Sequence, residues 1–115
     1  MHVTIYHNPR CSKSRQTLQL LQEQGIEPEI IEYLQTPPDK SRLREILKLL
    51  GLKPRELMRT KEAAYQEAKL DNGKLSDDQL IDAMIKQPLL IERPIVVANG
   101  RAALGRPPEN VLRIL

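Results

Sequence analysis

The chain has 115 residues, which suits one domain with a modest hydrophobic core. Its net charge is +3, its lysines and arginines are dispersed, and aromatic residues make up only 3%, so it lacks the basic stripe and stacking aromatics of a nucleic-acid binder. No apolar run is long enough for a signal peptide or a membrane span, so we expect a cytoplasmic protein with no membrane partner.

The first third of the chain predicts a β-α-β unit. Residues 3–6 (VTIY) are β-branched or aromatic and predict a strand. Residues 12–24 predict a helix that Gly25 terminates, and residues 29–33 (EIIEY) predict a second strand. A helix between two strands favours a parallel pair with a right-handed crossover.

The middle of the chain predicts a block of helices. Residues 36–39 (TPPD) predict a loop that interrupts regular secondary structure and offers an N-cap. Apolar residues then recur at helical spacing as far as Gly51. Ser76 offers the cap of a later helix. We expect helices over residues 43–50, 54–58, 61–69 and 77–85, with a turn at residues 71–73.

The last quarter predicts a β-hairpin and a terminal helix. Residues 94–98 (PIVVA) form a β-branched run, and Asn99-Gly100 is a strong signal for a hairpin turn into residues 101–104. A loop at residues 105–108 leads to an expected helix over residues 109–115. The order of elements predicts one α/β domain, residues 1–115, with a mixed sheet of about four strands and an inserted helical block.

The chain has one cysteine, Cys11, between the first expected strand and the first expected helix. At a helix start the first N–H groups have no intrahelical partner and the helix end carries partial positive charge. Both effects favour the thiolate, which is the reactive form of cysteine. A lone cysteine cannot form an intrachain disulfide or a cysteine-rich metal site, so we expect no metal.

The residues around Cys11 are basic or carry hydroxyl groups. They are His7, Arg10, Ser12, Lys13, Ser14 and Arg15. The hydroxyls can donate hydrogen bonds to sulfur or to an oxyanion, and the backbone amides after Cys11 could form a nest for a tetrahedral anion. A free cysteine is often buried and inert, but flanks such as Arg10 and Ser12 disfavour that alternative here.

Residues 7–15 (HNPRCSKSR) resemble the cysteine loop of the arsenate reductases that are coupled to glutathione and glutaredoxin. Residues 76–81 (SDDQLI), 92–97 (ERPIVV) and 105–108 (GRPP) are similar to strings of that family, so the resemblance covers nearly the whole chain. It implies a thioredoxin-like fold. Arg10 before the cysteine, Ser12 after it and an end at Leu115 resemble a shorter subgroup of the family.

The resemblance also implies roles for individual residues. Cys11 would be the nucleophile that attacks arsenate. The arginines that hold the oxyanion would be Arg59, Arg93 and Arg106, and a planar guanidinium suits a tetrahedral oxyanion. His7 and Ser14 would help to keep the cysteine ionised, and Pro94 would be a cis-proline that faces it. Arg10 is a further supporting residue because it adds positive charge beside the thiol.

These inferences predict a thiol-dependent arsenate reductase with no bound cofactor, in which glutathione is the co-substrate and glutaredoxin the partner. Two alternatives stay open. One is a monothiol oxidoreductase that acts on glutathione mixed disulfides. The other is a non-catalytic regulator that binds a protein such as RNA polymerase, as the Spx-type relatives do. Those regulators carry a CxxC pair, and Ser14 at the second position here excludes an internal disulfide switch.

Overall fold

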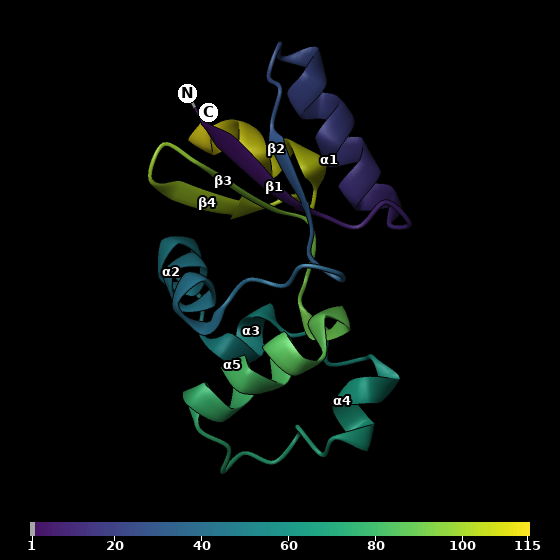
Figure 1. Ribbon diagram of the computed structural model, residues 1–115, viewed down its shortest axis with the longest axis vertical. Helices are drawn as coiled ribbons and strands as arrows, with labels where there is room; N and C mark the ends of the chain where they lie inside the picture. The colour runs from purple at the N-terminus through teal and green to yellow at the C-terminus, as the bar shows by residue number, and fades with distance from the viewer. Residues whose placement is uncertain (1) are drawn as a thin grey trace. The chain divides into compact units, whose positions relative to one another are not determined.

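The computed structural model describes residues 2–115 and divides into two compact units (Figure 1). The first unit runs to Thr36 and resumes at Arg93–Leu115, and the second is Pro37–Glu92. The first unit contains the whole sheet and the second contains helices. The prediction of a single domain over residues 1–115 stays a prediction.

The first unit is built on a four-stranded sheet in the order β2-β1-β3-β4. β1 (Val3–His7) pairs in parallel with β2 (Glu29–Glu32), and α1 (Ser12–Glu23) makes the crossover between them. β3 (Ile95–Ala98) is antiparallel to both β1 and β4 (Arg101–Leu104). The predicted α/β class, mixed sheet and β-α-β unit are confirmed.

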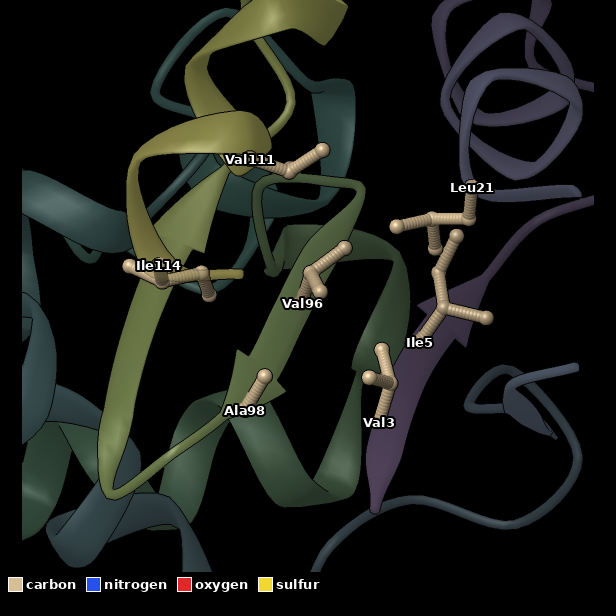
Figure 2. Close-up of a cluster of buried hydrophobic side chains, with 7 residues drawn as sticks. All are labelled: Val3, Ile5, Leu21, Val96, Ala98, Val111 and Ile114. Atoms are coloured by element: carbon tan, nitrogen blue, oxygen red, sulfur yellow. The ribbon is translucent and has the colours of Figure 1, made fainter. Parts of the chain in front are cut away.

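One face of this sheet packs against α1 and the C-terminal segment η2 (Pro108–Ile114), as Figure 2 shows. Alternate residues of a strand point to the same face, so β1 and β3 each supply two side chains to this core. Its buried members are Val3, Ile5, Leu21, Val96, Ala98, Val111 and Ile114. Because β1 is anchored by this core, the loop after it starts from a rigid strand end.

The hairpin between β3 and β4 and the C-terminal helix both follow the sequence prediction. Asn99 and Gly100 both have positive φ, 55° and 69°, as a two-residue type I′ turn requires. The helix expected over residues 109–115 is present as the 3₁₀-helix η2, which begins at Pro108 and ends at Ile114. Its turns are closed by i→i+3 bonds, such as the one from the N–H of Asn110 to the carbonyl of Pro107 at 3.0 Å.

The second unit consists of short helices: α2 (Lys40–Leu50), α3 (Pro54–Leu57), α4 (Ala63–Glu67), α5 (Asp77–Lys86) and η1 (Pro88–Leu90). Asp39 caps α2 by accepting a hydrogen bond from the N–H of Arg42 at 2.7 Å, and Gly51 ends it in the left-handed conformation. Ser76 caps α5 through a reciprocal capping box with Gln79. The caps predicted for both long helices are confirmed.

Two features of the second unit differ from the sequence prediction. The helix expected over residues 61–69 is shorter, because α4 spans only Ala63–Glu67 and Lys69 adopts a positive φ of 56°. The 3₁₀-turn η1 was not predicted, since a proline followed by two leucines carries no helical period. After η1, Ile91 forms an isolated antiparallel bridge with Met58, so an extended segment lies beside the helices.

Candidate functional site

Cys11 is the N-cap of α1 and the last residue of a tight turn that follows β1. The N–H of Cys11 donates to the carbonyl of Asn8 at 3.0 Å, and the side chain of Asn8 accepts from the N–H of Arg10 at 3.0 Å. Asparagine stabilises turns in this way by bonding to its own backbone two residues on. The turn therefore fixes the thiol at the positive end of a 12-residue helix.

The thiol points inward while its neighbours face outward. Cys11 is 8% exposed, whereas the flanking Arg10 and Ser12 are exposed. Within residues 2–115 the sulfur makes no capping hydrogen bond to the first turn of α1. The first N–H groups of the helix therefore stay available to an anion that approaches the sulfur.

The guanidinium of Arg106 contacts the sulfur of Cys11. Its Nη2 lies 3.9 Å from Sγ of Cys11, and its Nε donates to the backbone carbonyl of Arg93 at 2.9 Å. The carbonyl of Arg106 accepts from Asn110 of η2 at 3.0 Å, so both ends of the residue are held. The structure thus brings together the Cys11 sulfur, the Arg106 guanidinium and the backbone carbonyl of Arg93, from three of the residues that the sequence singled out.

His7 and Ser14 form a buried pair behind the cysteine loop. His7 Nδ1 lies 2.6 Å from Oγ of Ser14, which also accepts from the N–H of Asn8 at 3.0 Å. Since the Ser14 oxygen already accepts one bond, the arrangement that uses every group has its hydroxyl donating to Nδ1 of a neutral imidazole. His7 ends β1 and Asn8 begins the loop, so Ser14 holds the start of the cysteine loop against α1.

The environment of His7 favours this neutral form. Burial lowers the pKa of His7 below its usual 6.5; Glu32 opposes this shift, and Arg15 adds to it. Desolvation penalises the charged imidazolium, as expected for a side chain packed at a strand end. Arg15 itself donates to the carbonyl of Pro9 at 3.0 Å, so its charge is tied to the same loop.

Pro94 precedes β3 and Gly105 follows β4, so the two residues lie at neighbouring strand ends. The peptide bond between Arg93 and Pro94 is cis, as the family resemblance implied, and that between Arg106 and Pro107 is also cis. The N–H of Gly105 donates to the carbonyl of Pro94 at 2.9 Å. No role was predicted for Asn8, Thr17 or Gly105; for Gly105 the available signal was its place directly before Arg106.

Arg59 and Arg10 occupy different settings from Arg106. Arg59 belongs to the second unit, where its guanidinium pairs with Glu62 at 2.5 Å and with Glu92 at 3.8 Å. Arg59 follows α3, and its N–H donates to the carbonyl of Leu90 at 2.7 Å, which fixes its backbone. Arg10 is exposed beside the thiol. The functional roles that the resemblance implies for the residues of this site remain predictions.

In residues 2–115, no group of three histidine, cysteine or acidic side chains is arranged to hold a metal ion. Of the helices in that range, none combines the length and the apolar character that crossing a membrane requires.

Comparison with known proteins gives consistent matches over the whole chain. The sequence model of the ArsC family matches residues 6–114. The Escherichia coli K12 protein YfgD, described as uncharacterized, is 60% identical over 98% of this chain and 96% of its own length. A Neisseria meningitidis protein named arsenate reductase is 53% identical over 98% of this chain and 97% of its own.

A solved structure agrees with these matches. The structure described as arsenate reductase from Vibrio cholerae superposes with a TM-score of 0.97 and is 56% identical. The match covers all of this chain and 98% of that one.

Proposed function

Because the chain belongs to the ArsC family, we propose that it is a thiol-dependent arsenate reductase whose nucleophile is Cys11. Its fold is the thioredoxin-like α/β fold that the resemblance implied. The observation that carries the proposal is the contact of 3.9 Å between the Arg106 guanidinium and the sulfur. A fixed positive charge beside a thiolate at a helix start suits attack on an oxyanion.

In the first step the Cys11 thiolate attacks arsenic(V). A sulfur–arsenic bond forms, and one arsenate oxygen takes up protons and leaves as water. Arg106 and Arg93 would offset the charge of the anion, and the free N–H groups at the start of α1 would add to this field. Arg59 is the third arginine that we assign to the oxyanion, from the family resemblance alone.

The second step needs a thiol from outside, since Cys11 is the only cysteine in the chain. A glutathione thiolate would attack the Cys11 sulfur, so that a disulfide forms and the electron pair of the sulfur–arsenic bond stays on arsenic. Arsenic is thereby reduced from the +5 to the +3 state and leaves as arsenite. A glutaredoxin thiol would then reduce the mixed disulfide by exchange. The reducing cytoplasm, where thiols are kept reduced, is the compartment that we assign to this cycle.

The test is arsenate-dependent oxidation of NADPH in the presence of glutathione, glutathione reductase and a glutaredoxin. We expect a rate that depends on arsenate concentration and is lost in Cys11→Ser. Ser41→Ala is the matched control, because Ser41 is an exposed serine of α2 to which no role in the site is assigned. Turnover that survives in Cys11→Ser would refute the proposal, as would a folded parent protein that shows no arsenate dependence.

A further inference from the structure

Gly105 lies where the packing leaves no room for a side chain. A Cβ atom built at this position would lie 2.4 Å from Oγ1 of Thr17 and 2.7 Å from Cγ of Pro94. Carbon atoms in favourable contact are about 3.5–4.0 Å apart, so an alanine here would force a displacement. The backbone of Gly105 does not adopt a positive φ, so space, and not backbone conformation, explains the glycine.

The two neighbours of Gly105 cannot easily give way. Thr17 is fully buried within α1, and its hydroxyl donates to the carbonyl of Lys13 at 2.8 Å. As a β-branched residue it has few side-chain rotamers on a helix. Pro94 is a buried ring whose carbonyl accepts from the N–H of Gly105 at 2.9 Å. A side chain at position 105 would therefore move the loop, and not its neighbours.

The loop that would move carries Arg106. Gly105 packs against the helix that begins at Cys11, and the next residue sends its guanidinium back to the Cys11 sulfur. A shift of the Gly105 backbone away from α1 would be transmitted directly to this contact, because residues 105 and 106 share a rigid peptide plane.

We infer that Gly105 is a positioning residue: its lack of a side chain sets how closely the Arg106 guanidinium approaches the Cys11 sulfur. The inference deepens the proposed function, and its consequence for turnover rests on that function. The geometric claim itself concerns only the electrostatic environment of the sulfur and can be tested without arsenate.

The test is the alkylation of Cys11 by two reagents of the same shape and different charge. Iodoacetate and iodoacetamide both form a carbon–sulfur bond and release iodide, but only iodoacetate carries a carboxylate for Arg106 to attract. The ratio of the two rate constants cancels changes in thiol ionisation and in exposure. We expect Gly105→Ala to lower the iodoacetate preference by about three- to tenfold, toward the value of Arg106→Gln.

Two further variants keep the test specific. Gly73→Ala is the matched control, because a Cβ there would meet no atom within 4 Å, and it should keep the parental ratio. Thr17→Ala removes the atom at 2.4 Å, so adding it to Gly105→Ala should restore part of the preference. A purely structural defect would slow both reagents alike and would leave the ratio unchanged.

An unchanged ratio in folded Gly105→Ala would overturn the inference. If Gly105→Ala does not fold, the double variant Thr17→Ala/Gly105→Ala is compared with Thr17→Ala alone. The remaining contact between position 105 and Pro94 should still lower the iodoacetate preference of the double variant. Equal ratios in these two proteins would again overturn the inference. A lowered ratio together with a parent that shows no arsenate turnover would uphold the positioning role and reject the proposed function.

Discussion

The guanidinium of Arg106 lies 3.9 Å from the sulfur of Cys11, although 95 positions separate the two residues in the chain. One residue begins the first helix and the other lies in the loop after the last strand. Packing of α1 and η2 on one face of the sheet brings these segments together. The site is therefore a product of the folded first unit and cannot form in the cysteine loop alone.

Replacement of Arg106 should weaken the handling of the oxyanion even when the charge is kept. In Arg106→Lys a point charge replaces a planar fork that bonds to the Arg93 carbonyl and the sulfur at once. We expect kcat/KM for arsenate to fall by about 10- to 100-fold, and further in Arg106→Gln. Steady-state kinetics measures this, with the exposed Arg101→Lys as the control. Equal kinetics for Arg106→Lys and the parent would contradict the assignment.

Loss of the Ser14 hydroxyl should destabilise the protein. In Ser14→Ala the buried N–H of Asn8 loses its acceptor and His7 loses its partner. We expect the free energy of unfolding to fall by about 1–3 kcal/mol, the cost of leaving a buried polar group unpaired. Urea denaturation measures the change. Ser12→Ala, at an exposed position two residues earlier, should change it far less, and equal losses in the two variants would count against the buried network.

Local signals predicted much of the fold. The Asn99-Gly100 turn, the Ser76 capping box and the glycine at position 51 each specify a backbone geometry over a few residues, and all three occur as expected. The failures lie where such signals are absent. The 3₁₀-turn η1 was not predicted, because a proline followed by two leucines carries no helical period.

The site was predictable only in part for the same reason. The position of Cys11 at a helix start depends on adjacent residues, so the sequence indicates it directly. The contact of Arg106 with the sulfur depends on tertiary packing, and the family resemblance alone pointed to it. No local sequence pattern indicates the close approach of Gly105 to Thr17, because a glycine in a loop is usually explained by the backbone conformations that it allows.

The cap of α5 offers a test of the second unit by itself. Ser76 accepts from the N–H of Gln79 at 3.1 Å, and Gln79 returns a bond to the N–H of Ser76 at 2.8 Å. Ser76→Ala removes the first bond, so we expect the free energy of unfolding to fall by about 1 kcal/mol. Chemical denaturation measures it against Ser41→Ala, an exposed serine within α2 that caps nothing. A loss no larger than that of Ser41→Ala would show that the box contributes little.

The titration of His7 gives a prediction on pH. Because burial disfavours the imidazolium, the pKa of His7 in the folded protein lies below 6.5. In a His2→Gln background His7 is the one histidine left, so its C2–H resonance can be followed by NMR without ambiguity. We expect a midpoint below 6.5, and a midpoint at or above that value would refute the buried neutral form.

The same shift fixes the sign of a change in stability. Between the lowered pKa of folded His7 and 6.5, the unfolded chain binds more protons than the folded one, so the free energy of unfolding falls as the pH falls through this window. His7→Asn keeps an acceptor for the Ser14 hydroxyl but does not titrate. We therefore expect the stability of the parent relative to His7→Asn to decrease between pH 7 and pH 5, measured by urea denaturation at each pH. Parallel pH profiles of the free energy of unfolding for the two proteins would mean that protonation of His7 does not cause the loss of stability.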